Sequence, residues 1–552
     1  QEIIVQNFRP KAGTRLEAAP ALDLEDHLWT IAAARLIFDA DMTIQAPPNL
    51  SPHALPRLIA AGINDWGGIS PVTPDHVNPE APWPTLDLLS HVTRACGKHL
   101  TERLAIFPSY AQDFSKWVDS SLHTNVLHLV DGSGYPRTDD WSPGLNNPPP
   151  QEILQKIEQP GPAVIGHFGK TLDQLMRGQG ATHSQLEQLF EARGQEFAAV
   201  CHQANDLRRA TNGESVTYVV NRNINYTNIC SYRCQFCAFA KGKTTEDLRG
   251  KPYLMPMSEL SDRVREAWQR GATEVCMQGG IHPSFTGQTY IDICRTAKEA
   301  APEIHVHAFS PLEVTHGAQT LGISLREFLS ELKNNGLSTL PGTAAEILND
   351  PVRDILCPDK INTAEWIEVM RTAHSIGIRT TSTIMFGHIE SYRDWAYHLT
   401  ALRNLQFETG GFTEFVPLPF IHMEAPIYRK GRSRKGPTFR EAVLMHAVAR
   451  LTLHPLISNI QASWVKMGER GVQACLQSGA NDLGGTLMNE SISKAAGASH
   501  GQEMTESGMC RIITELGRSP LQRTTLYGQP TGRNLPDRRS IREPILIASC
   551  VT

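Results

Sequence analysis

The chain has 552 residues, of which 40% are hydrophobic and 20% are charged, and its formal net charge at pH 7 is −5. This globular composition excludes a long disordered, collagen-like or coiled-coil chain. The weak charge argues against a protein that coats nucleic acid or an anionic membrane, and no apolar run reaches the roughly 18 residues of a membrane span. The chain starts at Gln1 without a signal peptide, so we expect a processed chain or a fragment that begins within a longer protein.

Residues 1–140 repeat a pattern found near the end of the chain. The matching residues keep a nearly constant separation in number: Arg35 with Arg450, Ile44-Gln45-Ala46 with Ile460-Gln461-Ala462, Gly62 with Gly479, Asp65 with Asp482, Gly97 with Gly517, and Arg103 with Arg523. Such a repeat indicates the duplication of a large unit. We interpret residues 1–140 as the C-terminal remnant of a first barrel, namely its last three βα units.

Residues 141–180 begin with turn-forming residues, including the run from Asn146 to Pro150. We interpret this segment as a linker, and a long surface loop is the alternative.

Residues 181–530 alternate β-rich apolar runs with amphipathic helical patterns, which is typical of βα units on a parallel sheet. A long helix is expected first, at about 184–209. Eight candidate strands follow: 215–226, 273–278, 305–309, 336–340, 378–385, 412–416, 459–464 and 481–484. They predict an α/β fold, a complete (β/α)8 TIM-like barrel whose strands all end on one face. Residues 531–552 are expected to form a tail.

Three of the eleven cysteines are grouped as C-x3-C-x2-C directly after the first strand of this barrel: Cys230, Cys234 and Cys237. Three thiolates on one tight loop can ligate three irons of a [4Fe–4S] cluster and leave the fourth iron open. Structural zinc usually takes four protein ligands, and no fourth Cys or His lies at the spacing of a zinc knuckle. We therefore favour the cluster over a zinc site or simple packing.

This motif, with Phe236 before its last cysteine, resembles the signature of radical S-adenosylmethionine (SAM) enzymes. Four segments are similar to the FO synthase family, which builds a deazaflavin chromophore: NRNINYTN (221–228), MQGGIHP (277–283), LPGTAAE (340–346) and NDLGGT (481–486). The resemblance covers essentially all of residues 180–530. Residues 1–140 resemble the C-terminal part of the partner subunit, so the order of the halves is that of the fused bifunctional form, truncated at its N-terminus.

The resemblance implies two cofactors, a [4Fe–4S] cluster and SAM. It implies a cytoplasmic transferase that forms a 5′-deoxyadenosyl radical and joins a hydroxybenzyl fragment of L-tyrosine to 5-amino-6-(D-ribitylamino)uracil. An external electron donor is expected, without nucleic acid or membrane partners. In the family, the partner half closes the ring through a cluster of its own. This chain has one C-x3-C-x2-C motif, so we expect the coupled adduct but not the finished deazaflavin.

The remaining site residues are also expectations. Gln278, Gly279 and Gly280 resemble the segment that contacts the SAM amino group, although an ordinary βα turn would have the same glycines. Glu346 could bind the SAM ribose, or it could be a carboxylate at a helix start. Four residues at the C-terminal ends of strands are candidates for substrate contact, each with a structural role as its alternative: His307, Glu313, His388 and Glu390.

Two other functions fit part of the sequence. A related radical SAM enzyme of menaquinone synthesis by the futalosine route shares several motifs, but the repeat in residues 1–140 argues against it. A metal-binding scaffold without turnover, with zinc on the three cysteines, is the alternative from a different class.

Overall fold

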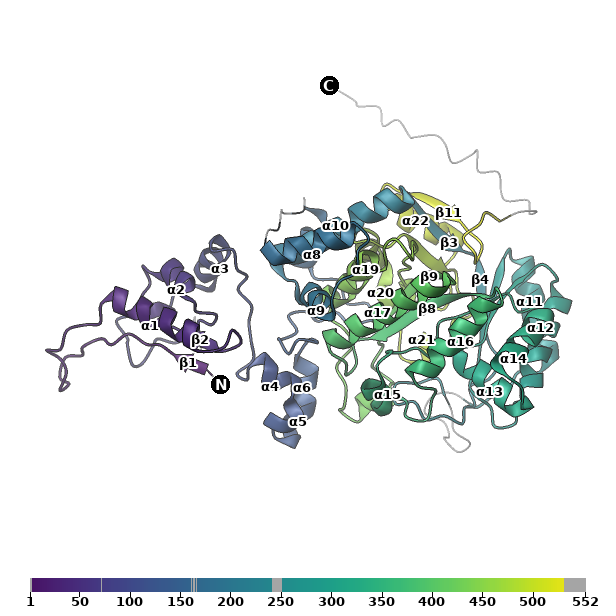
Figure 1. Ribbon diagram of the computed structural model, residues 1–552, viewed down its shortest axis with the longest axis horizontal. Coiled ribbons are helices and arrows are strands. Elements are labelled where there is room, and N and C mark those ends of the chain that lie inside the picture. The colour runs from purple at the N-terminus through teal and green to yellow at the C-terminus, as the bar shows by residue number, and fades with distance from the viewer. Residues whose placement is uncertain are drawn as a thin grey trace, which may run out of the picture. The chain divides into compact units, whose positions relative to one another are not determined.

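The computed structural model describes residues 2–70, 72–159, 161, 164, 166–240 and 251–530, so the expected tail lies outside the described residues. The chain folds as two compact units, residues 1–102 and residues 103–552 (Figure 1). In the described part, no helix is long and apolar enough to cross a membrane.

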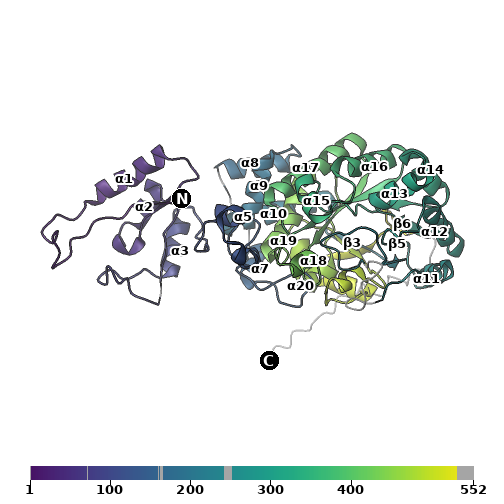
Figure 2. The same cartoon turned by 90° about the horizontal axis from the view of Figure 1, so that it is seen from below.

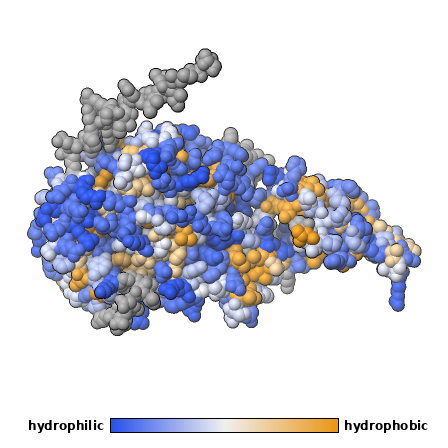
Figure 3. Space-filling view, turned by 180° about the vertical axis from the view of Figure 1, so that it is seen from behind, coloured by the Kyte–Doolittle hydropathy of each residue, from blue (hydrophilic) through white to orange (hydrophobic). Residues whose placement is uncertain are grey.

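The smaller unit combines short parallel strands with α-helices: β1 (Glu2–Ile4), α1 (Leu24–Ile37), β2 (Thr43–Gln45), α2 (Leu55–Ala61) and α3 (Leu86–Ala95). Its core includes Ile31, Ile44 and Leu58, which are fully buried. The far side of α1 is apolar as well, because Trp29 is 72% and Leu36 is 87% exposed. Figure 3 shows apolar areas on the surface of this unit.

The strands of the smaller unit repeat the pairing found at the end of the larger unit. Strand β1 pairs in parallel with β2, and Gln45 bridges Asp65 in parallel. In the larger unit, Gln461 bridges Asp482 in the same way. The sequence repeat is therefore also a repeat of backbone geometry, as duplication predicts.

The larger unit contains a parallel barrel. Its strands are β3 (Ser215–Val219), β4 (Asn221–Asn225), β5 (Glu274–Gln278), β6 (His305–Ala308), β7 (Thr339–Leu340), β8 (Arg379–Phe386), β9 (Phe412–Pro419), β10 (Asp482–Gly485) and β11 (Ser519–Gln522). Strands β4 to β9 pair in sequence order, all in parallel. This order confirms the predicted α/β barrel class.

Isolated bridges close the ring. Phe415 of β9 bridges Ile460, Gln461 bridges Asp482 of β10, and β10 pairs with β3, which runs directly into β4. The expected strand at 459–464 is thus reduced to these bridges, and the expected strand at 215–226 is divided into β3 and β4. Strand β11 adds to the outer edge of β3.

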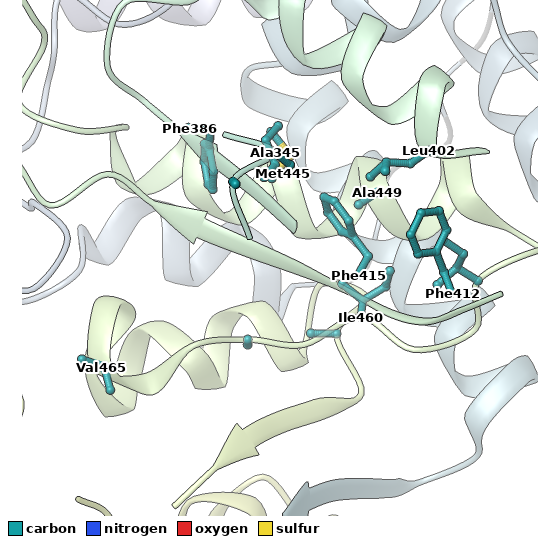
Figure 4. Close-up of a cluster of buried hydrophobic side chains, with 14 of the residues drawn as sticks. Ala345, Phe386, Leu402, Phe412, Phe415, Met445, Ala449, Ile460 and Val465 are labelled. Atoms are coloured by element: carbon teal, nitrogen blue, oxygen red, sulfur yellow. The ribbon is translucent and has the colours of Figure 1, made fainter. Parts of the chain in front are cut away.

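The helices of the barrel unit surround the strands (Figures 1 and 2). Those that follow β4 to the end of the barrel are α11 (Met257–Gln269), α12 (Gly287–Ala300), α13 (Pro311–Leu321), α14 (Leu325–Asn334), α15 (Asp350–Leu356), α16 (Thr363–Ser375), α17 (Tyr392–Thr409), α18 (Pro426–Arg429), α19 (Phe439–Leu453), α20 (Trp464–Leu476), α21 (Ile492–Ala495) and α22 (Glu506–Glu515). Figure 4 shows Phe386 of β8 and Phe412 and Phe415 of β9 in one apolar cluster with Met445 and Ala449 of α19. This core fixes the strands whose ends carry the candidate site.

The expected linker at 141–180 differs from the structure, because this segment is part of the barrel unit. It forms α7 (Gln151–Glu158) and α8 (Gly166–Met176), which contact α10 (Gly194–Asn212). Leu154 and Ile157 of α7 are buried in the main core, as are Leu172 and Leu175 of α8. This spacing of apolar residues at i and i+3 makes an amphipathic helix, which the proline-rich start of the segment obscured.

The expected boundary near residue 140 also differs, since the smaller compact unit ends at Glu102. Residues 103–140 form α4 (Pro108–Gln112), α5 (Phe114–Trp117) and α6 (His123–Leu129). Buried polar contacts then tie this segment to α19: the Gly132 N–H donates to Glu441 Oε1 at 2.8 Å, and Arg440 pairs with Asp131 at 3.0 Å. The helix expected at 184–209 is divided into α9 (His183–Glu191) and α10, whose first residue, Gly194, has a φ of 56°.

Candidate active site

The loop with the three grouped cysteines follows β4 directly, at the C-terminal end of the barrel strands. The loop that follows β5 holds its first part. The Gly280 N–H donates to the Thr227 carbonyl at 2.9 Å, and the Ser231 N–H donates to the Ile281 carbonyl at 2.9 Å. The cysteine loop therefore lies beside the glycine segment, as the right-handed βα order predicts.

The connection between α15 and α16 holds the middle of the cysteine loop. The Gln235 N–H donates to the Leu356 carbonyl at 2.8 Å, and the Arg233 N–H donates to Asp359 Oδ2 at 3.0 Å. These two contacts bracket Cys234, so the loop around the second cysteine has a fixed backbone.

Burial and backbone N–H groups act in opposite directions on the grouped thiols. Burial raises the pKa of the Cys234 thiol and of the Cys237 thiol. Two backbone N–H groups point at sulfur: Ile281 donates to Cys230 Sγ and Ala240 donates to Cys237 Sγ, each at 3.3 Å. N–H groups of this kind stabilise thiolate ligands of iron–sulfur clusters.

Within the described ranges, no three Cys, His, Asp or Glu side chains are arranged so that they could share one metal ion. Whether these residues suit an iron–sulfur cluster is therefore judged from their chemistry. The loop carries three soft thiols, and two of them accept backbone N–H hydrogen bonds. These residues fit an iron–sulfur cluster. Because burial raises the pKa of the Cys234 and Cys237 thiols, cluster binding has to release protons from them and becomes weaker at low pH.

Gly279 and Gly280 are sites of close approach between loops. A Cβ on Gly279 would lie 2.2 Å from the Tyr226 ring, and one on Gly280 would lie 2.3 Å from the Ile229 carbonyl oxygen. Glycine is therefore required here by contacts within the protein. Gln278 ends β5 opposite Asn225 of β4 and so lies next to the start of the cysteine loop.

Glu346 is connected to the cysteine loop by Lys360, which contacts both. Its carboxylate Oε1 accepts a hydrogen bond from Lys360 Nζ at 2.8 Å, and each side chain is only 11% exposed. Lys360 Nζ in turn lies 5.2 Å from the ring centroid of Phe236, between the second and third cysteines. The backbone of Glu346 has a φ of 45°, in the left-handed region that non-glycine residues rarely adopt.

Both carboxylate oxygens of Glu313 accept hydrogen bonds from other groups of the protein. It closes a capping box at the start of α13, where Oε2 accepts hydrogen bonds from the Ser310 N–H and hydroxyl, both at 2.7 Å. Its other oxygen accepts the Tyr226 hydroxyl and the Gly279 N–H. Burial raises the pKa of Glu313. This residue positions the loops after β4 and β5.

His307 of β6 is buried inside the barrel, where its Nδ1 lies 2.7 Å from Thr339 Oγ1 of β7. Burial lowers the pKa of His307, so the neutral ring is favoured. The same threonine oxygen lies 2.8 Å from His305 Nε2. His307 is thus part of the contact between two strands.

His388 and Glu390 form a buried pair after β8, with Nδ1 2.6 Å from Oε2. The Trp395 indole N–H donates to Glu390 at 2.9 Å, and Arg434 lies 3.8 Å away. Burial alone would raise the pKa of Glu390, but His388 and Arg434 hold it well below its ordinary value. The pair connects β8 to the segment before α19.

Several residues near the site were missed by sequence reasoning. Lys360 and Asp359 follow Cys357-Pro358 and carry no motif of their own, so only the folded connection places them beside the cysteines. Inside the barrel, Arg523 pairs with Asp482 at 2.5 Å and with Glu414 at 3.2 Å. The match of Arg523 to Arg103 in the sequence repeat was the one available signal for it.

A cavity of about 620 Å³ lies elsewhere, at the start of α20, and is lined by Pro148, Trp464 and His500 among others. None of the predicted site residues line it.

A parallel barrel with a C-x3-C-x2-C loop directly after β4 defines a radical SAM enzyme. The family model described as "Radical SAM superfamily" matches residues 224–402, and the model "CofH/MqnC C-terminal region" matches residues 409–536. The crystal structure of methylornithine synthase shares the fold with a TM-score of 0.51 at 17% identity, over 63% of this chain and 97% of that one.

The relatives define the family more closely. An FO synthase of Streptomyces coelicolor is 44% identical over 96% of this chain and 65% of its own length, so the chain spans less than two thirds of that relative. A 5-amino-6-(D-ribitylamino)uracil–L-tyrosine 4-hydroxyphenyl transferase of Methanopyrus kandleri is 51% identical over 59% of this chain and 88% of its own length. The chain belongs to the FO synthase family, which confirms the resemblance seen in the sequence.

Proposed function

We propose that the barrel of residues 181–530 is the tyrosine-coupling half of a fused FO synthase. It transfers the hydroxybenzyl group of L-tyrosine to 5-amino-6-(D-ribitylamino)uracil. The observation that carries this proposal is the 51% identity to the Methanopyrus kandleri transferase across 88% of that enzyme. The relatives' names favour this reading over the menaquinone enzyme.

Cys230, Cys234 and Cys237 hold a [4Fe–4S] cluster in this proposal. Bound together, the cluster and SAM would supply radical chemistry directed at tyrosine, with the electron coming from an external donor. The protein positions these groups. Hydrogen bonds from the backbone of the cysteine loop to the loop after β5 and to the connection between α15 and α16 hold the loop in place.

SAM is assigned to the space beside Gln278, Gly279, Gly280 and Glu346. This assignment is supported by the proximity of these residues to the cysteine loop. The Gly280 N–H donates a hydrogen bond to the Thr227 carbonyl oxygen, and Glu346 pairs with Lys360, which lies against the loop. The glycines already contact protein atoms, so they shape the site by allowing the two loops to approach.

The candidate substrate residues receive positioning roles. Glu313 holds Tyr226 and Gly279, and the His388–Glu390 pair fixes the turn after β8 through Trp395. His307 joins β6 to β7. These contacts keep the strand ends rigid, which radical chemistry requires because a misplaced radical attacks the protein.

Anaerobic reconstitution tests the proposal. The 552-residue chain is loaded with iron and sulfide, and SAM cleavage is followed with and without L-tyrosine and the pyrimidine. We expect three-cysteine cluster binding and SAM cleavage that tyrosine stimulates. Zinc binding without SAM cleavage would contradict the proposal and favour a scaffold.

A further inference from the structure

A largely buried cation lies against the cysteine loop. The Lys360 side chain is 11% exposed, and its ammonium group lies 5.2 Å from the centroid of the Phe236 ring. Its neighbour Asp359 accepts the Arg233 N–H at 3.0 Å. Residue 359 thus contacts the residue before Cys234, and residue 360 contacts the second residue after it.

The Lys360 ammonium group carries more N–H donors than the described residues provide acceptors for. An ammonium group carries three N–H donors, and burying it is costly unless they are satisfied. Among the described residues, Glu346 Oε1 at 2.8 Å is its one hydrogen-bonding acceptor, with the Phe236 ring as a weaker cation–π partner. A negatively charged centre on the adjacent cysteines would complete its surroundings.

A second lysine near the same loop provides a contrast. Lys430 Nζ donates to Gln235 Oε1 at 2.7 Å, but this lysine is exposed. Water and salt screen an exposed charge, whereas a charge enclosed by protein acts through a much lower dielectric. Of these two lysines, only Lys360 is placed to act strongly on the cysteine loop.

We propose that Lys360 sets the reduction potential of the cluster held by Cys230, Cys234 and Cys237, and that Glu346 opposes it. Reduction adds one electron from the external donor to the cluster, so the reduced state carries one more negative charge. A buried cation stabilises that state and a buried carboxylate destabilises it. This inference rests on the cluster of the proposed function.

The test is the midpoint potential of the reconstituted full chain, measured without SAM by a reductive titration followed by electron paramagnetic resonance. We expect Lys360→Met to shift the potential to more negative values and Glu346→Gln to shift it to more positive values. Lys360→Arg keeps the charge and should stay near wild type. Lys430→Met is the matched control and should not move the potential.

Opposite shifts of the midpoint potential distinguish an effect of charge from a disturbed loop. A disturbed loop would not move the potential in opposite directions when a positive and a negative charge are removed. A loaded Lys360→Met variant with the wild-type potential would overturn the inference. If that variant fails to take up iron, the midpoint potential of Glu346→Gln is the test. An unchanged or more negative potential in Glu346→Gln would overturn the inference. Failure of the wild-type chain to form a cluster would instead refute the proposed function.

Discussion

Arg35 donates a hydrogen bond from Nε to the Gly62 carbonyl oxygen at 2.9 Å, and Arg450 donates the same bond to Gly479 at 2.8 Å. The pairs hold corresponding places in the two units. Likewise, the Ile44 N–H donates to Asn64 Oδ1 at 2.8 Å, as the Ile460 N–H does to Asn481 Oδ1 at 2.9 Å. The repeat that the sequence predicted is therefore preserved in individual side-chain contacts.

Removal of one cysteine tests the metal site. Cys234→Ala is expected to lose the brown iron–sulfur chromophore and SAM cleavage together, because two thiols cannot hold the cluster. Cys510→Ala, outside the motif, is the control and should keep both. Iron content, the visible spectrum and 5′-deoxyadenosine release measure these losses. Retained SAM cleavage in Cys234→Ala would contradict the assignment of the cluster to these cysteines.

A methyl group at Gly280 tests the contact between the loops after β4 and β5. Its Cβ would lie 2.3 Å from the Ile229 carbonyl oxygen and 2.9 Å from Cys230 Cβ, so backbone must move. We expect Gly280→Ala to cost about 1–3 kcal/mol in the free energy of unfolding and to lower iron uptake. The control is Gly180→Ala, whose Cβ would meet only Arg403 Nε at 3.8 Å. Equal stability of the two variants would contradict this account.

Replacement of Glu313 tests its positioning role. Glu313→Gln replaces a carboxylate that accepts hydrogen bonds from Ser310, Tyr226 and Gly279. We expect a loss of about 1–3 kcal/mol, because a buried donor is left without its acceptor. Chemical denaturation measures it, with the exposed Glu331→Gln as control. An unfolding free energy equal to that of the control would show that the network does not stabilise the fold.

Acid stability tests the buried charges around α19. Burial would raise the pKa of Glu441, but Arg434 and Arg440 lower it to about 2. A depressed carboxyl pKa stabilises the fold above the ordinary value of 4.5, and this contribution disappears as the pH falls from about 4.5 towards 2. Glu441→Gln should therefore flatten the loss of stability over this range. An unchanged pH profile in that variant would contradict the prediction.

The extent of the reaction is a further prediction. With one C-x3-C-x2-C motif, the 552-residue chain is expected to form the coupled adduct and to need an intact partner enzyme for the fluorescent deazaflavin. Fluorescence of the reaction mixture, with and without that enzyme, measures this. Fluorescent product from the chain alone would mean that one cluster serves both reactions.

The barrel and its cysteine loop could be predicted because periodic apolar strands and a tight C-x3-C-x2-C spacing are local signals. Residues 141–180 could not, since prolines at 148–150 hide the apolar pairs that later bury α7 and α8. Lys360 could not either, because its place beside Phe236 depends on a connection far away in sequence. The roles of Gln278 and Glu346 toward SAM stay predictions.

The most direct test of the central claim is mass spectrometry of the products after anaerobic incubation with SAM, a reductant, the pyrimidine and ring-labelled L-tyrosine. The proposed function predicts a product that combines the pyrimidine with the labelled hydroxybenzyl group, together with 5′-deoxyadenosine. Cleavage of SAM with no label transferred to the pyrimidine would contradict it.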